Sequence, residues 1–180
     1  MKTTIGVMGA SIISDPAIED TAFQIGMLIA ERGATLVTGA TSGLPFAAAR
    51  GAKKAGGEVV GFSPALNRAE HLRLGLPDTH HDWIIYTGLS FNGRNLLNVR
   101  ASQGLLFIGG SIGTLNEFTI AYAEDKILGV VANTGGFCNY INEWMQHLSR
   151  PNSKAILYCS PDPAELIDRI FESVHKQFSE

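Results

Sequence analysis

Four short segments of the sequence are rich in glycine, serine and threonine, which are residue types that can bind a phosphate group. They comprise residues 9–11, 39–43, 87–94 and 109–114. Small side chains let backbone N–H groups approach a phosphate, and the N-terminus of a following helix adds a favourable dipole. Small residues also occupy strand-to-helix turns for conformational reasons alone, but four converging loops favour a ligand site. The candidate phosphate-binding residues are Gly9, Ala10, Ser11, Gly39, Thr41, Ser42, Gly43, Arg94, Gly109, Gly110, Ser111, Ile112, Gly113 and Thr114.

Two charged side chains beside these loops could orient a ligand or act on it. Glu117 follows the last loop, but Thr114-Leu115-Asn116-Glu117 also fits the capping box T-x-x-E, in which the glutamate binds the N–H of the capping threonine. Capping and catalysis are compatible, and the sequence leaves both open. Arg94 could pair with a phosphate or a carboxylate, or it could be an ordinary surface arginine. Arg94 and Glu117 are candidate catalytic residues only if the protein is a hydrolase.

Other nucleotide and metal motifs are missing from the sequence. The first turn, residues 6–11, contains no G-x-G-x-x-G, and no acidic residue follows Thr38 to hold a ribose diol, which argues against NAD and FAD. A Walker A loop is missing as well. The histidines of residues 63–82 lack the spacing of metal ligands, so we assign no metal. The two cysteines are too few for a disulfide framework, and we expect packing as the role of Cys138.

The elements that must position these residues alternate between short β-rich runs and longer runs of helical period. Asp15-Pro16 predicts the start of a helix, and Gly33 predicts its end. Right-handed crossovers would wind the elements into one doubly wound, mostly parallel, Rossmann-like α/β domain over residues 1–180, with its ligand site beyond the carboxyl ends of the strands. We expect strands at residues 3–8, 34–38, 58–62, 83–86, 105–108, 127–131 and 155–158, and helices at residues 17–32, 44–55, 91–102, 114–124, 137–148 and 163–178.

Composition narrows the functional classes. Hydrophobic residues make up 45% of the chain and charged residues 17%, a globular balance. The formal net charge of -3 disfavours nucleic acid as a partner, because affinity for a phosphate backbone needs clustered lysine and arginine. No apolar run is long enough to span a membrane, and residues 3–8 read as a strand rather than a signal peptide, so we expect a cytoplasmic protein. The looser segment, residues 63–82, could form a lid or a wall of the site.

The glycine-rich run from Gly109 to Glu117 resembles the signature P-G-G-x-G-T-x-x-E of the Lonely guy proteins, whose relatives include the molybdenum-cofactor carrier proteins and, more distantly, the DNA-processing protein A group. Arg94 and Arg100 fall where the phosphoribohydrolases carry R-K-x-x-x-x-R. Residues 9–11, 38–44 and 133–137 resemble three further segments of the family. The resemblance therefore covers most of the chain.

The departures from the signature favour the carrier branch of this superfamily. Gly109 and Ser111 replace the signature proline and second glycine, and Asn95 replaces the lysine after the key arginine. In the enzymes, the residues that match Arg94 and Glu117 cleave the N-glycosidic bond of a nucleoside 5′-monophosphate without a cofactor.

The resemblance thus implies a small phosphorylated ligand, either a nucleoside monophosphate or the molybdenum cofactor. It also implies a homodimer or a higher homo-oligomer. We favour a binding protein over a phosphoribohydrolase, and we rank a DNA-handling role last.

Overall fold

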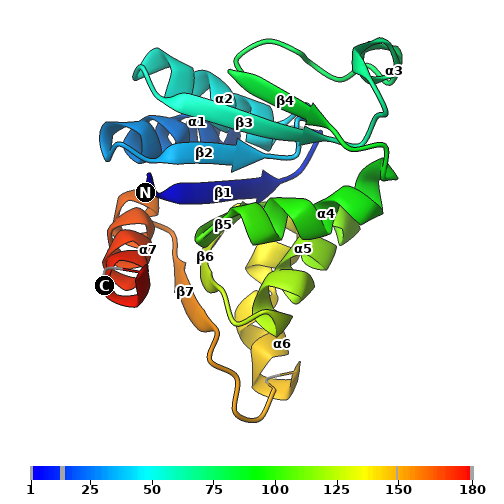
Figure 1. The fold of residues 1–180 in the computed structure, drawn as a ribbon. Helices are drawn as coiled ribbons and strands as arrows, with labels where there is room; N and C mark the ends of the chain where they lie inside the picture. Colours follow the sequence, from blue (N-terminus) through cyan, green and yellow to red (C-terminus); the bar gives the residue numbers. More distant parts are fainter. Residues whose placement is uncertain (1, 13–14, 149, 179–180) are drawn as a thin grey trace.

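The computed structural model describes residues 2–12, 15–148 and 150–178 and contains one seven-stranded sheet. The strands are β1 (Thr4–Gly9), β2 (Thr35–Thr38), β3 (Glu58–Ser63), β4 (Trp83–Tyr86), β5 (Gly104–Ile108), β6 (Ile127–Val131) and β7 (Ile156–Ser160). Their order across the sheet is β4-β3-β2-β1-β5-β6-β7, and every neighbouring pair is parallel (Figure 1). The doubly wound, Rossmann-like α/β fold predicted from the sequence is confirmed.

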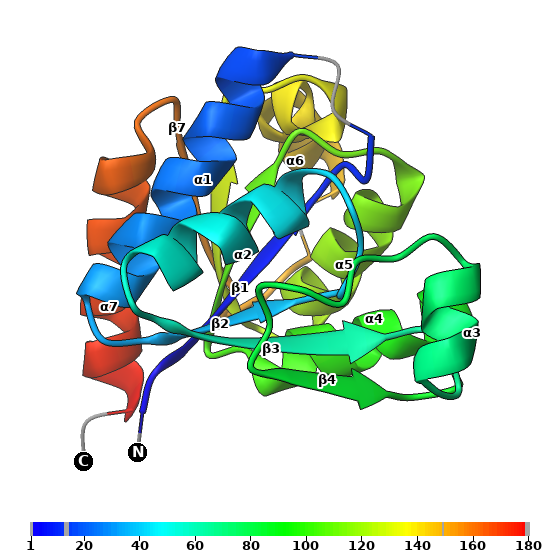
Figure 2. The same cartoon turned by 90° about the horizontal axis from the view of Figure 1, so that it is seen from above.

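Helices cover both faces of this sheet, as Figures 1 and 2 show from two directions. Helices α1 (Pro16–Glu31), α2 (Leu44–Lys54) and α7 (Pro163–Phe178) pack on one face, where Ile25, Ala48 and Ile170 share a buried apolar cluster with β1 and β2. Helices α4 (Ser90–Ala101), α5 (Ile112–Ala123) and α6 (Ile141–Leu148) pack on the other face around Phe107 and Phe118. No helix among the described residues is long and apolar enough to cross a bilayer.

The first helix begins and ends where the sequence signals predict. The side chain of Asp15 accepts a hydrogen bond from the backbone N–H of Ala17 at 2.9 Å, and Pro16 opens the helix. Gly33 follows the helix with a φ of 74°, a left-handed conformation that favours glycine. These signals are local, and for that reason the sequence alone could place α1 to within a residue.

Two predicted elements differ from the structure. Residues 63–82, expected as a loop, contain the short helix α3 (Arg68–Arg73), which lies beyond the carboxyl ends of β3 and β4 (Figure 1). Six residues are too few for helical periodicity to stand out. The helix expected at residues 137–148 is instead a 3-10 turn, η1 (Gly136–Asn139), followed by α6. Gly135 and Gly136 both have positive φ, which bends the chain tightly before α6 starts.

The strand order reverses between β1 and β5. The chain runs outward from β1 through β2 and β3 to β4, then returns through α4 to pair β5 with the other side of β1. In open α/β sheets, the crevice beyond the carboxyl ends of the strands at such a switch point is the usual ligand site. The loops that follow Gly9 and Ile108 must therefore flank the site.

Candidate functional site

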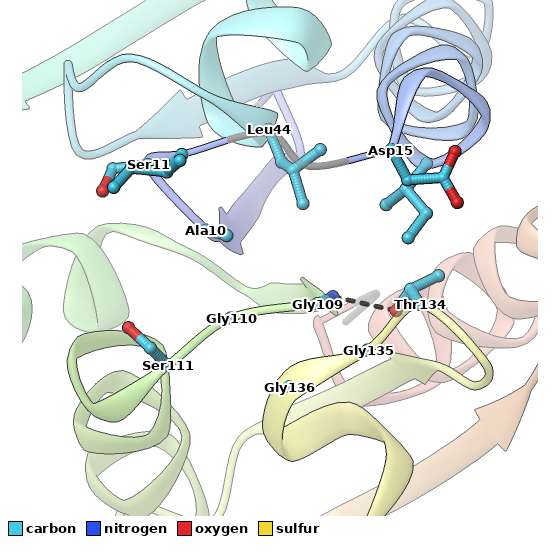
Figure 3. Close-up of a pocket in the computed structure, with 12 residues that line it drawn as sticks. Ala10, Ser11, Asp15, Leu44, Gly109, Gly110, Ser111, Thr134, Gly135 and Gly136 are labelled. Carbon is cyan, nitrogen blue, oxygen red and sulfur yellow. Dashed lines mark hydrogen bonds between the residues drawn. The ribbon is translucent and has the colours of Figure 1, made fainter.

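A cavity of about 410 Å³ lies at this switch point. Figure 3 shows its lining residues in two facing rows, with Ala10, Ser11, Leu44 and Asp15 above and residues 109–111 and 134–136 below. The volume falls within the roughly 300–1,000 Å³ of ordinary small-molecule sites. Two of the four predicted loops, residues 9–11 and 109–114, line this cavity together with a fifth loop after β6.

Close backbone contacts fix the loops around the cavity. The N–H of Leu44 donates to the carbonyl of Ala10 at 2.8 Å, and the N–H of Phe137 donates to the carbonyl of Gly110 at 3.1 Å. A Cβ added to Gly136 would lie 1.8 Å from the Gly110 oxygen, and one added to Gly43 would lie 2.2 Å from the Ala10 oxygen. Glycine is required at both positions because the neighbouring backbone occupies the space of a side chain.

The N-terminus of α5 opens on the site without a side-chain cap. Helix α5 begins at Ile112, and its N-cap residue Ser111 makes no capping hydrogen bond. The first turn of a helix leaves its N–H groups without helical partners, so those of Ile112, Gly113 and Thr114 are available to an anion. By contrast, Gly109 is not a donor to a ligand, because its N–H binds the hydroxyl oxygen of Thr134 at 2.8 Å.

The capping box, one of the two roles that the sequence left open for Glu117, is not formed. Thr114 lies inside α5 rather than at its N-cap, since the helix starts two residues earlier. Glu117 instead accepts hydrogen bonds from α4. The local pattern T-x-x-E was therefore overridden by a contact between helices.

The helices differ in whether a side chain caps their N-terminus. Asp15, Asn67 and Asp162 cap α1, α3 and α7 with their side chains. The N-termini of α2, α4 and α5 have no such cap. Residues of these three helices line the cavities of the site. All three of these uncapped helix ends thus lie at the site, where a ligand could supply the missing acceptors, although the capped N-terminus of α1 also lies at the larger cavity.

A second cavity of about 130 Å³ adjoins the first and shares Ala10, Ser11 and Ser111 with it. Unlike the larger cavity, this smaller cavity is lined by residues of all four predicted loops. Its lining comprises Gly9, Ala10, Ser11, Thr41, Phe91, Asn92, Arg94, Asn95, Ser111, Gly113, Thr114 and Glu117.

A buried ion pair forms the floor of the smaller cavity. Arg94 Nη1 donates to Glu117 Oε1 at 2.9 Å, and each residue is only 6% exposed. Asn98, one turn after Arg94 on α4, donates from Nδ2 to the same carboxylate oxygen at 3.0 Å. Among the described residues, Glu117 Oε2 has no hydrogen-bond donor. One oxygen of the carboxylate is thus held and the other is free.

The electrostatics of this pair reflect its burial. Burial raises the pKa of the Glu117 carboxyl above its ordinary value, while Arg94 and the hydrogen bond from Asn98 oppose the rise. Burial likewise lowers the pKa of Arg94, against the effect of Glu117. In the described part of the chain, Arg94 Nε and Asn98 Oδ1 are buried without a partner. Unpaired polar atoms of this kind are uncommon and point to a missing ligand atom or water.

Four predicted binding residues line neither cavity, namely Gly39, Ser42, Gly43 and Ile112. Gly39 lies behind Arg94, where an added Cβ would come within 2.4 Å of Nη2. Ser42 donates from its hydroxyl to the Ser11 carbonyl at 3.1 Å. The side chain of Ile112 is 80% exposed, although its N–H opens on the site. These residues shape the loops rather than the cavity walls.

Sequence reasoning missed several lining residues. Thr134, Gly135 and Gly136 lie in the loop after β6, and the paired glycines in a loop after a buried strand could have identified them by the rule used for the other loops. Asp15 also lines the larger cavity, but its sequence context indicated only a helix start. No sequence signal places it at the site.

The segment of residues 63–82 contributes no lining residue to either cavity, so the expected wall of the site is not formed there. Its histidines hold the segment together. The ring of the buried His71 bonds Ser63 Oγ at 2.8 Å and the Pro77 carbonyl at 3.0 Å, and His81 bonds Thr38 Oγ1 at 2.9 Å. Within the described ranges, no group of three metal-ligating side chains comes together.

Comparisons with known proteins agree on one family. The model of the SLOG cluster4 family matches residues 2–165. An uncharacterized protein of Archaeoglobus fulgidus is 35% identical over 122 residues, which is 68% of this chain and 75% of that protein. These matches confirm the superfamily that the sequence motifs predicted.

Two solved structures resemble the fold over nearly the whole chain. The molybdenum cofactor binding protein of the phototrophic bacterium Rippkaea orientalis matches with a TM-score of 0.78 and 30% identity, over 97% of this chain and 98% of that one. The Moco carrier protein of Chlamydomonas reinhardtii matches with a TM-score of 0.78 and 25% identity, over 98% and 99%.

Proposed function

Because the chain belongs to the SLOG cluster4 family, we propose that it binds a phosphorylated pterin-type ligand of the molybdenum-cofactor class. The named neighbours from Rippkaea orientalis and Chlamydomonas reinhardtii support this choice over a nucleoside monophosphate. In this proposal the protein is one domain over residues 1–180, acts as a cytoplasmic homodimer or higher homo-oligomer, and carries its ligand without transforming it.

The observation that carries the proposal is the uncapped N-terminus of α5 at the junction of the two cavities. The N–H groups of Ile112, Gly113 and Thr114 have neither helical partners nor a side-chain cap. Three converging N–H groups and the helix dipole favour an anion there. Ser111 and Ser11, shared by both cavities, can add hydroxyl donors beside it.

The remaining parts of the site fit the rest of such a ligand. The cavity of about 410 Å³ extends from the phosphate position along Leu44 and residues 134–136 and offers room for a fused ring. Arg94 lines the smaller cavity together with Ser111 and Gly113 at the start of α5, and its charge would stabilise a dianion there. A protein that only carries this ligand needs no catalytic residue at the site.

A fluorescence titration with the oxidised, phosphorylated pterin derived from molybdenum cofactor tests this function, with the phosphatase-treated pterin in parallel. We expect the phosphorylated form to bind at least about tenfold more tightly, which corresponds to roughly 1.4 kcal/mol. Ser111→Asp should remove this preference, because the new carboxylate caps α5 and repels the phosphate. Asn67→Asp also places an aspartate at a helix N-cap, that of α3, and should leave the preference for the phosphorylated pterin unchanged. Equal affinity for both pterins would refute the proposal.

A second candidate function rests on Glu117, whose buried carboxyl has a raised pKa and one free oxygen. In a phosphoribohydrolase, the N-glycosidic bond of a nucleoside monophosphate breaks, water adds to the ribose carbon, and a proton passes to the released base. Glu117 would stabilise positive charge on the sugar or activate that water. Incubation with nucleoside monophosphates and assay for free base decides between the candidates. Base release that Glu117→Gln abolishes would contradict a pure carrier.

A further inference from the structure

One carboxylate in the larger cavity is at odds with a site that only binds phosphate. Asp15 is the sole charged side chain among the described residues that line this cavity. A negative charge would repel a phosphorylated ligand unless another part of that ligand donates hydrogen bonds to it. The position of Asp15 therefore carries information about the end of the ligand that is remote from the phosphate.

Asp15 and the proposed phosphate position lie at opposite ends of the cavity. Figure 3 shows Ser11 and Ser111 at one end and Asp15 above Thr134 at the other. The carboxylate is fixed in place because Oδ1 caps α1 by accepting the N–H of Ala17 at 2.9 Å. Among the described residues Oδ2 has no donor, so the carboxylate keeps acceptor capacity for a ligand.

The other described side chains at this end are apolar or already hydrogen-bonded. The hydroxyl of Thr134 donates to the Val131 carbonyl at 2.6 Å and accepts from the Gly109 N–H at 2.8 Å. Ile18 and Leu44 form apolar walls of the same cavity. A flat ring between these walls would present its edge to the carboxylate of Asp15, the one charged acceptor among the described lining residues.

We propose that Asp15 selects a ring whose edge carries an N–H next to an amino group, the 2-amino-4-oxopyrimidine edge that pterins and guanine share. Two adjacent donors match the two oxygens of a carboxylate, and hydrogen bonds to a charged acceptor are about twice as strong as neutral ones. Asp15 is exposed at the edge of the cavity. A ring that presents an unprotonated nitrogen or a carbonyl there would place its lone pairs against the negative charge of the carboxylate, which is unfavourable. The inference rests on the proposed function and names the ligand class of the same site.

Glu117 is the rival for this role, and its contacts argue against it. Its Oε1 already accepts from Arg94 and Asn98, and it lies in the cavity of about 130 Å³. That volume is below the roughly 300 Å³ of the smallest ordinary ligand sites. The smaller cavity therefore suits the phosphate or a sugar, and the larger one suits the ring.

Calorimetric titration of GMP, IMP and ribose 5-phosphate, with the phosphorylated pterin as a fourth probe, tests the inference. GMP and IMP differ only in the 2-amino group, so we expect wild-type protein to prefer GMP at least about tenfold. Asp15→Asn should reduce this ratio to within about threefold, while ribose 5-phosphate binds no more weakly than to wild type. Asparagine caps helices as well as aspartate does, so α1 should be preserved. Asp162→Asn at the cap of α7 is the matched control and should keep the preference.

The outcomes separate this inference from the function on which it rests. If ribose 5-phosphate or the phosphopterin binds wild-type protein but GMP and IMP bind equally, the role of Asp15 is refuted and the phosphate site stands. The same holds if Asp15→Asn keeps the full preference for GMP. If none of the four probes binds wild-type protein, the proposed function fails and this inference fails with it.

Discussion

Replacing Arg94 by methionine should destabilise the protein by leaving Glu117 buried without its counter-ion. Arg94 and Glu117 are each 6% exposed and are joined at 2.9 Å, so neither charge is well solvated. Removing one partner of a buried pair costs about 3–5 kcal/mol. At roughly 2–4 °C per kcal/mol for a chain of this length, Tm should fall by about 6–20 °C. Methionine fills much of the volume of the aliphatic part of arginine, so the substitution creates little empty space and this contributes little to the loss of stability.

The pH dependence of this loss identifies its cause. Arg94 lowers the pKa of Glu117, which burial raises, so Arg94→Met must raise that pKa further in the folded protein. The folded chain then binds more protons than the unfolded chain between the two pKa values, and stability falls as pH rises through that window. The difference in unfolding free energy between variant and wild type should therefore be larger near about pH 8 than near about pH 5.

Urea denaturation followed by circular dichroism at both pH values measures this effect. Arg94→Met/Glu117→Gln should recover most of the lost stability, because glutamine still accepts from Asn98 and carries no charge. Arg100→Met on the same helix removes only an exposed contact with Glu124, so this variant should have the same free energy of unfolding as the wild type. A loss that is equal at both pH values, or that the double variant does not recover, would refute the explanation by an uncompensated charge.

Three further predictions follow from single positions. Gly113→Ala should stabilise the free protein by about 0.5–1 kcal/mol, because alanine favours a helix over glycine and the added Cβ meets no atom within 4 Å. It should also weaken binding of the phosphopterin, because Gly113 lines the smaller cavity. Thermal denaturation measures the first effect and titration the second. Gly39→Ala would displace Arg94 and should weaken phosphopterin affinity about tenfold in the same titration, so an unchanged Kd would show that Arg94 does not touch the ligand. Burial raises the pKa of the Cys138 thiol to about 12; mass spectrometry should find it alkylated at neutral pH only after denaturation.

The loops of the site were predictable because they follow strands. Gly9 and Ile108 end buried strands that pair with each other in register, so the residues after them must meet at one edge of the sheet. That inference needs only the alternation of strands and helices and the parallel rule. The segments 9–11 and 109–114 that this rule selected both contribute lining residues to the larger cavity, and the same rule would have selected residues 134–136 after β6.

Local sequence patterns did not give the partners of individual side chains, and only the family resemblance linked Arg94 with Glu117. Glu117 lies 23 residues from Arg94, and nothing local indicates that α4 and α5 bring them together. The local pattern instead favoured a bond between Glu117 and Thr114, which the start of α5 at Ile112 prevents. Asp15 is a similar case, since its role as a helix cap is local while its place in the cavity depends on the distant loop after β6.

The features that sequence rules explain least well are the ones gathered at the site. Helices α2, α4 and α5 start there without side-chain caps, although substituting a cap typically costs about 1 kcal/mol. Arg94 Nε, a donor, and Asn98 Oδ1, an acceptor, are two of the three unpaired buried side-chain atoms in the described part of the chain, and both residues contact Glu117. The third, Arg50 Nε, is the exception. A protein that only needed to be stable would have capped these helices, as it does for α1, α3 and α7. A ligand of the proposed kind would supply acceptors to the open N–H groups of these helix ends.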